Sequence, residues 1–196
     1  MASKKTPAKA NRSDNRKPEI LDTAAKLFSE KGYHAVSMRD IAKETGMLPG
    51  SLYYHFSSKE NLLYSVYERG VNVIAAQVDA ATASQDEPWD KLAAACSTHL
   101  EELLGNNAYA QVVTRILPQD VESIRKELGI LRDSYENRFK VLIASLGLDE
   151  DVDQMYLRLL LLGALNSTLS WYNKKSGSPS AISKELIKIV GQKIKN

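Results

Sequence analysis

The side chains with the most distinctive chemistry in this sequence lie between Gly32 and Lys59. The second half of this stretch carries hydroxyl, phenol, imidazole and ammonium groups in close succession, at Ser51, Tyr53, Tyr54, His55 and Lys59. Hydroxyl and ammonium groups donate hydrogen bonds to phosphate oxygens, and a short helix that presents them on its outer face is typical of DNA recognition. Ordinary packing would explain a single tyrosine, but the whole set at this spacing favours a surface that binds DNA.

The sequence offers little that an enzyme would need. It contains no glycine-rich loop of the kind that binds nucleotide phosphates, and its three histidines, His34, His55 and His99, lack the spacing of metal ligands. The single cysteine, Cys96, is better explained as a buried apolar residue than as a nucleophile. We therefore expect no catalytic site, no metal site and no cofactor. A helical adaptor would account for the rest of the chain but not for the polar face around Tyr54.

Two short helices must position these side chains. Ser37 is a candidate N-cap for a helix over Met38–Glu44, with the charge of Asp40 suited to its first turn. A glycine turn follows, and Pro49 then begins a second short helix. A preceding helix, from residue 18 to the glycine at position 32, repeats its apolar residues at helical spacing. The sequence therefore predicts a three-helix unit in which residues 37–56 form a helix-turn-helix.

Helical periodicity continues through the remaining two-thirds of the chain. Ser57 and Glu60 are expected to form a capping box at the start of the next helix. The breaks between segments contain Gly, Pro, Ser or Asn, and the expected spans are 58–83, 86–104, 107–116, 118–146, 150–173 and 179–194. No segment shows convincing strand-like alternation with a period of two residues. We therefore predict an all-α fold.

Charge and hydropathy bear on the partners. The net charge is only +2, but the first 17 residues are strongly basic. Such an arm suits a polyanion, although a flexible, solvated tail would have the same composition. No apolar run reaches the roughly 20 residues of a membrane span, and the N-terminus lacks the apolar core of a secretory signal. We expect a cytoplasmic protein with no membrane partner.

The stretch from about Pro18 to Tyr67 resembles the DNA-binding domain of the TetR family of repressors. The resemblance rests on Phe28-x3-Gly32-Tyr33, Val36-Ser37-Met38-Arg39-Asp40-Ile41-Ala42, Gly46, Ser51-Leu52-Tyr53-Tyr54-His55-Phe56 and Ser58-Lys59-Glu60-x-Leu62-Leu63. Pro49 and Gly50 depart from it, because many members carry longer, base-reading side chains there. The residues that the resemblance implies as DNA contacts are Ser37, Arg39, Pro49, Gly50, Ser51, Tyr53, Tyr54, His55 and Lys59.

The same resemblance implies an organisation and a function. Residues 1–17 would be a flexible basic arm, residues 18–64 the DNA-binding domain, and residues 65–196 a ligand-binding and dimerisation domain. The last two long helices of two subunits would form a four-helix bundle, so that a homodimer binds a palindromic site on double-stranded operator DNA. The protein would be a repressor that a small-molecule effector releases. A transcriptional activator of the same fold is the alternative.

The effector site is expected among polar groups in mostly apolar helices. Asn166 is the best candidate, because an unpaired amide in its apolar surroundings would be costly. Arg115 and Arg158 suit a carboxylate or phosphate, as in an acyl-CoA. A resemblance of residues 46–53 and of the Trp171-Tyr172 pair to regulators of lipid or steroid catabolism points the same way. The full set of candidates is His99, Tyr109, Arg115, Arg158, Asn166, Trp171 and Tyr172.

Overall fold

The structure, a computed structural model, describes residues 16–173 and 175–194. Within these residues the regular elements are all helices, which confirms the predicted all-α fold. The α-helices are α1 (Lys17–Lys31), α2 (Met38–Glu44), α3 (Pro49–His55), α4 (Lys59–Ala83), α5 (Pro88–Leu104), α6 (Ala108–Arg115), α7 (Arg125–Ala144), α8 (Gln154–Trp171) and α9 (Pro179–Ile194). The predicted basic arm lies outside the described residues except for Arg16 and Lys17.

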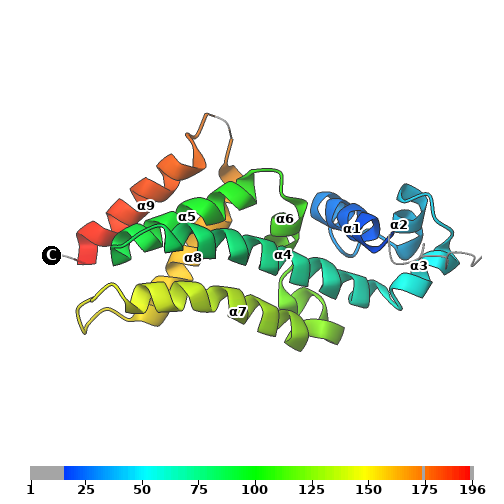
Figure 1. The fold of residues 1–196 in the computed structure, drawn as a ribbon, viewed down its shortest axis with the longest axis horizontal. Coiled ribbons are helices and arrows are strands. Elements are labelled where there is room, and N and C mark those ends of the chain that lie inside the picture. Colours follow the sequence, from blue (N-terminus) through cyan, green and yellow to red (C-terminus); the bar gives the residue numbers. More distant parts are fainter. Residues whose placement is uncertain (1–15, 174, 195–196) are drawn as a thin grey trace, which may run out of the picture.

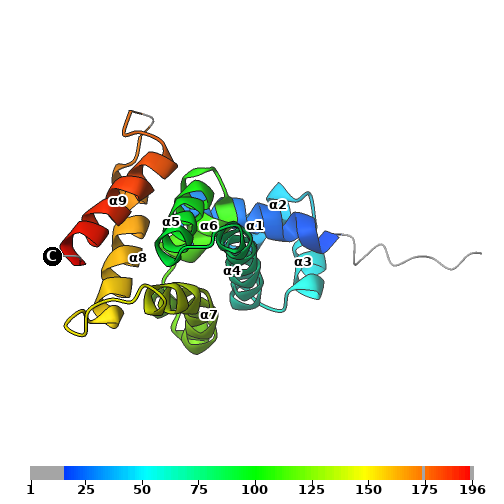
Figure 2. The ribbon, with the colours of Figure 1, turned by 60° about the vertical axis from the view of Figure 1, so that its left-hand side comes forward.

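Helices α1, α2 and α3 gather at one end of an elongated molecule (Figure 1). Helix α4 runs from this end along most of the molecule, and α5 to α9 pack around its second half (Figure 1). A turned view places α8 and α9 on the side opposite α1 to α3 (Figure 2). The three-helix end therefore connects to the larger helical part chiefly through α4, α6 and the ends of the neighbouring loops.

Local sequence signals explain the three-helix end. The predicted cap of α2 is confirmed: the Asp40 backbone N–H donates to Ser37 Oγ over 3.2 Å, and the Ser37 N–H donates to the Asp40 carboxylate over 2.8 Å. Gly46 adopts a φ of 63°, which glycine reaches without strain and which turns the chain toward α3. Fully buried Ile41 and Leu52 pack in the core of this end. The geometry of α2 and α3 is thus fixed by caps, a glycine turn and a small apolar core.

The helix predicted over residues 118–146 does not form as one element. Two short 3₁₀ turns, η2 (Pro118–Asp120) and η3 (Glu122–Ile124), precede α7. The Asp120 carboxylate accepts a hydrogen bond from the Leu117 N–H over 2.8 Å, and Val121 leaves the helical region with φ −135° and ψ 82°. This local bond closes the turn after Leu117 and delays the start of α7.

Two other helix starts also differ from prediction. The N-cap of α4 is Ser58, whose hydroxyl accepts from the Asn61 N–H over 3.1 Å, so the expected box between Ser57 and Glu60 is wrong. Helix α8 begins at Gln154, four residues later than expected, because the Asp153 carboxylate caps its first turn. At α4 the cap is the serine next to the expected one, and at α8 the aspartate cap, for which no residue had been predicted, sets the start.

A close helix crossing joins the two parts of the molecule. A Cβ atom added to Gly70 on α4 would lie 2.8 Å from Val113 Cγ2 and 2.9 Å from the Tyr109 carbonyl oxygen. Glycine at this position therefore lets α6 approach the backbone of α4.

Among the helices described, none has an apolar stretch long enough to pass through a lipid bilayer.

Candidate nucleic-acid interface and interior cavity

Helix α3 presents one polar, aromatic face to solvent. Leu52 anchors the helix in the core, whereas Tyr53 and Tyr54 are 51% and 78% exposed, and Ser51 is also exposed. Pro49 begins the helix. Gly50 is exposed, and a Cβ atom there would meet no other atom within 4 Å, so a binding partner could approach the protein backbone closely at this position. His55 is half-buried, with its ring against the edge of Tyr54 at a centroid distance of 5.7 Å.

Leu48 is an exposed residue of this face that the sequence did not single out. Leu48 is the N-cap of α3 and is 76% exposed. Such exposure is unusual for a leucine in a small helical domain, where large apolar side chains normally pack into the core. An apolar side chain at this place could contact a thymine methyl group in the major groove. Its position immediately before Pro49 was the available signal, because a residue before proline is extended and lies outside the helix.

Ser37 and Arg39 flank the start of α2, and both are exposed. Hydrogen bonds from the Ser37 hydroxyl and backbone N–H hold the pKa of the Asp40 carboxyl below its usual value. The Asp40 side chain therefore stays ionised and locks the cap. Ser37 and the neighbouring Arg39 are thus held at a fixed helix start in the three-helix end.

Lys59 is engaged within the protein. Its Nζ donates to the carbonyl oxygens of Tyr33 and Val36 over 2.9 and 2.8 Å and lies 4.1 Å from the centre of the Tyr33 ring. Burial lowers the pKa of Lys59, and the neighbouring Glu60 carboxylate opposes this shift. Glu60 in turn accepts a hydrogen bond from the Tyr33 hydroxyl over 3.0 Å. Lys59 thus ties the loop before α2 to the start of α4, and one of its three N–H groups remains for another acceptor.

An interior cavity of about 30 Å³ lies in the larger part of the molecule. Side chains from α4, α5, α6, α7 and α8 line it, and its polar groups come from His99, Arg132, Tyr135, Glu136, Asn166 and Thr114. The cavity has room for about one water molecule. A larger molecule would therefore have to move the surrounding helices apart.

His99 is a fully buried polar group in the wall of this cavity. Its Nδ1 lies 2.7 Å from the Tyr135 hydroxyl, and its Nε2 lies 3.0 Å from Oδ1 of Asn166. Since the amide oxygen accepts, the imidazole proton resides on Nε2 and Tyr135 donates to Nδ1. Burial lowers the pKa of His99 to about 4; the bond to Asn166 opposes this shift and the charge of Arg132 adds to it. The ring is therefore neutral at physiological pH.

The seven residues that the sequence nominated for an effector do not come together. His99 and Asn166 line the interior cavity, and Arg158 lines an outer cleft of about 190 Å³ between α7 and α8. Tyr109 and Arg115 instead contact α1: the Tyr109 hydroxyl donates to Asp22 over 2.6 Å, and Arg115 Nη1 donates to the Ser29 carbonyl oxygen over 2.8 Å. Trp171 and Tyr172 lie at the end of α8 and line neither space.

Four polar residues of the cavity wall were missed by the sequence reasoning: Thr114 of α6 and three residues of α7. Arg132, Tyr135 and Glu136 lie on one stripe of α7 that also contains buried Leu128 and Phe139. Their spacing of three and four residues within an apolar stripe was a usable signal. This signal was obscured because the expected helix, over residues 118–146, was too long and its buried face was not assigned.

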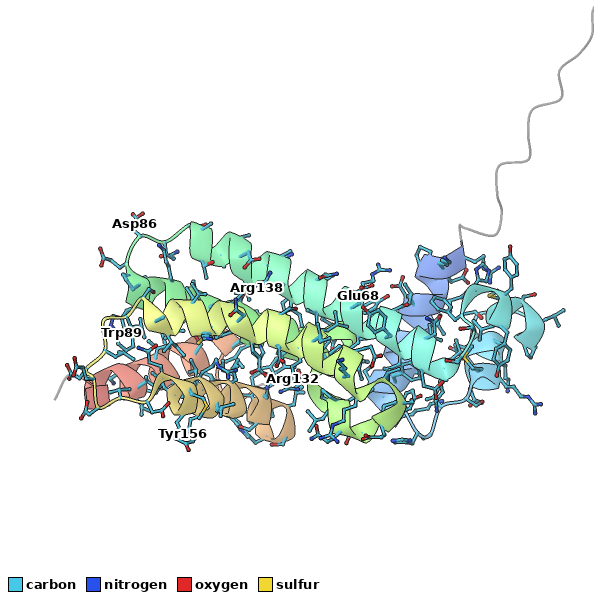
Figure 3. All side chains as sticks on the ribbon, turned by 90° about the horizontal axis from the view of Figure 1, so that it is seen from below. Glu68, Asp86, Trp89, Arg132, Arg138 and Tyr156 are labelled. Atoms are coloured by element: carbon cyan, nitrogen blue, oxygen red, sulfur yellow. The ribbon has the colours of Figure 1, made fainter. Side chains whose placement is uncertain are left out.

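Helix α8 also has a face that the chain leaves uncovered. Leu160 is 72% exposed and Tyr156 is 60% exposed, and Tyr156 projects outward from the helix (Figure 3). Met155, Leu159 and Trp171 of α8 and Ile189 of α9 are exposed as well. A concentration of large exposed apolar side chains along one helix, here α8, indicates a protein contact surface.

Comparisons with known proteins agree with this geometry. Residues 20–66 match the model of bacterial regulatory proteins of the tetR family, and residues 85–194 match the model of the tetracyclin repressor-like C-terminal domain. The second match alone covers more than half of the chain.

Individual relatives extend the comparison. The chain is 24% identical over 184 residues to a fatty acid metabolism regulator protein of Bacillus subtilis, covering 91% of this chain and 95% of that protein. It is 33% identical over 104 residues to the transcriptional repressor KstR2 of Mycobacterium tuberculosis, covering about half of each chain. Its fold is similar to that of the regulator FadR from Bacillus subtilis, solved with stearoyl-CoA, with a TM-score of 0.75 and 24% identity over 88% of this chain and 96% of that one.

The chain therefore belongs to the tetR family of bacterial regulatory proteins and is a DNA-binding transcriptional regulator, not an enzyme.

Proposed function

We propose that the protein is a ligand-released repressor that binds a palindromic operator as a homodimer. The observation that carries this proposal is the α3 face, where exposed Ser51, Tyr53 and Tyr54 surround a single buried anchor, Leu52. Exposed phenol and hydroxyl groups on a helix after a tight turn suit the major groove and its phosphates. The similarity to the KstR2 repressor supports repression, and activation is the alternative, because the activator FasR of Mycolicibacterium smegmatis is 36% identical over 97 residues.

The DNA contacts follow from exposure. We assign phosphate contacts to Ser37, Arg39 and the remaining N–H of Lys59, and contacts to base edges or phosphates to Ser51, Tyr53, Tyr54 and His55. Pro49 and Gly50 would let the backbone approach the groove closely. Residues 18–64 would act as the DNA-binding domain and residues 65–196 as the effector and dimerisation domain, in a cytoplasmic protein.

The homodimer would form through α8 and α9. Exposed Tyr156 and Leu160 supply an apolar surface that a second copy of the chain would bury. Two copies related by a twofold axis present two α3 helices, and such an arrangement matches the twofold symmetry of a palindromic site.

The effector would occupy the interior cavity, where His99 and Asn166 offer fixed hydrogen-bonding groups among apolar walls. A fatty acyl thioester or a related lipid-like compound suits these walls, and the similar FadR structure was solved with stearoyl-CoA. Since the cavity holds only about 30 Å³, the effector would stabilise a more open arrangement of helices.

Helix α6 would transmit that opening to the DNA-binding end. One side of α6 lines the cavity with Val113 and Thr114, and the other side holds α1 through Tyr109 and Arg115. Movement of α6 would therefore change the distance between the two α3 helices of a dimer.

Operator affinity of two variants tests this proposal. Tyr54→Ala removes a side chain that is 78% exposed and is expected to weaken binding to the operator without lowering the unfolding temperature. Lys59→Ala is expected to weaken binding and to reduce the slope of affinity against salt by about one. Acyl-CoAs should release the wild-type protein from the operator. If both variants bind the operator as tightly as the wild type, the assigned DNA contacts are wrong. If acyl-CoAs do not release the wild-type protein from the operator, the proposed effector is wrong.

A further inference from the structure

One carboxylate is shared by two guanidinium groups at the junction of α7 and α8. Glu136 Oε1 lies 2.9 Å from Arg132 Nε, and Glu136 Oε2 pairs with Arg158 Nη1. The side chains are only 15% to 26% exposed. Charge pairs of this kind are weakly screened, and the group of three carries one net positive charge. A half-buried cationic group of this kind is favourable only while an anion accompanies it.

Glu136 also separates two spaces. It lines the interior cavity together with Arg132, and it lines the outer cleft of about 190 Å³ together with Arg158 and Lys140. The Glu136 side chain therefore stands where a molecule passing from the outer cleft to His99 and Asn166 would have to go. Figure 3 labels Arg132 on α7, and this residue lines the interior cavity together with Ile74 of α4.

We propose that Glu136 occupies the place of an anionic group of the effector. The effector enters between α7 and α8, its apolar part passes toward His99, and its carboxylate or phosphate replaces the Glu136 carboxylate on Arg158 and Arg132. This inference rests on the proposed effector cavity and names the chemistry of its ligand as an amphipathic anion.

The charges at the cleft agree with this ligand. When Glu136 turns away, the positive charges of Arg132, Arg158 and Lys140 are opposed by Asp133 alone, so the net charge of this group of side chains rises from +1 to +2. A guanidinium group binds carboxylate and phosphate oxygens with paired donors, which a neutral hydroxyl cannot match. An uncharged molecule would instead leave Glu136 in place and would meet a closed passage.

The test uses the full-length protein and three probes with the same ten-carbon chain: decanoate, decyl phosphate and decanol. Binding is measured by calorimetry for the wild type, Glu136→Gln, Arg158→Gln and the control Arg138→Gln. Arg138 is an arginine of the same helix that pairs with Asp79 of α4 on the other side and lines neither the interior cavity nor the α7–α8 cleft.

The proposal predicts opposite signs for the two variants. Glu136→Gln removes the internal competitor and should tighten binding of the anionic probes by about tenfold, whereas Arg158→Gln should weaken it by about tenfold. Arg138→Gln should leave it unchanged, and decanol should bind weakly to all four proteins. Preference for decyl phosphate over decanoate assigns the group to a phosphate, and the reverse preference assigns it to a carboxylate.

Equal binding of decanol and the anions, or anion binding that neither variant changes, would overturn the inference. If Glu136→Gln does not fold, as circular dichroism would report, Arg158→Gln decides alone. Operator binding of the wild type without probe is measured separately. A protein that binds no operator but binds anions as predicted would refute the proposed function and leave this site standing.

Discussion

Lowering the pH from 7.5 to 4 tests how the protein holds His99. The pKa of this buried ring is about 4 in the folded chain and 6.5 in the unfolded chain. Between these two values the unfolded chain binds a proton that the native protein does not, so the free energy of unfolding falls as the pH falls. A separation of about 2.5 pH units corresponds to a loss of about 3 kcal/mol. The loss should begin near pH 6.5 and be complete near pH 4.

Urea denaturation at a series of pH values measures this effect as a difference between wild type and His99→Gln. The glutamine can still bond to Tyr135 and Asn166 but does not titrate. The carboxyls of Asp40 and Glu60, whose pKa values are lowered in the native state, titrate in both proteins and cancel in the difference. His55→Gln, at a histidine outside the cavity, serves as the control and should follow the wild type. Parallel pH curves for wild type and His99→Gln would refute the reasoning.

Three further substitutions address the cap, the helix crossing and the α8 surface. Ser37→Ala should lower the free energy of unfolding by about 1 kcal/mol, because it removes the cap of α2, whereas Ser57→Ala should not; equal values in urea denaturation would contradict this. Gly70→Ala should lower the free energy of unfolding by about 1–3 kcal/mol, because the added methyl group would overpack against Val113 and the Tyr109 carbonyl. Gly129→Ala on α7 has open space around it and should not lower this free energy. Thermal melts in which Gly70→Ala is as stable as Gly129→Ala would contradict the close crossing of α4 and α6. Leu160→Lys should yield a monomer in analytical ultracentrifugation, while Ile130→Lys, which is also exposed, should remain a dimer; a dimeric Leu160→Lys would move the interface away from α8.

The three-helix end was largely predictable because its signals are local. The Ser37 cap and the glycine turn at Gly46 set the bounds of α2 and α3 within a few residues, and no contact with distant parts of the chain is needed to interpret them. The starts of α4 and α8 were misplaced for an equally local reason. Ser57 and Ser58 are both good caps for α4, and the sequence alone does not decide between them; at α8 the cap Asp153 was not identified.

The interior cavity was only partly predictable because it depends on which helices meet. Asn166 and His99 were nominated as polar groups in apolar helices, and they bond to each other across 67 residues of sequence. Tyr109 and Arg115 satisfied the same criterion but point to α1, which no pattern within α6 distinguishes. Tyr135 bonds to His99 as the third member of this polar group, because α7 begins at residue 125 and its buried face, which contains Tyr135, points into the core.

Selection of genomic fragments by the purified protein at near-physiological salt, followed by sequencing, shows whether α3 recognises a specific operator. We expect enrichment of one palindromic site by the wild type and loss of that enrichment by Tyr54→Ala, whose side chain is 78% exposed on the α3 face. Salt-sensitive binding with no enriched sequence, or the same enrichment by Tyr54→Ala, would contradict the assignment of α3 as the DNA-recognition helix of this regulator.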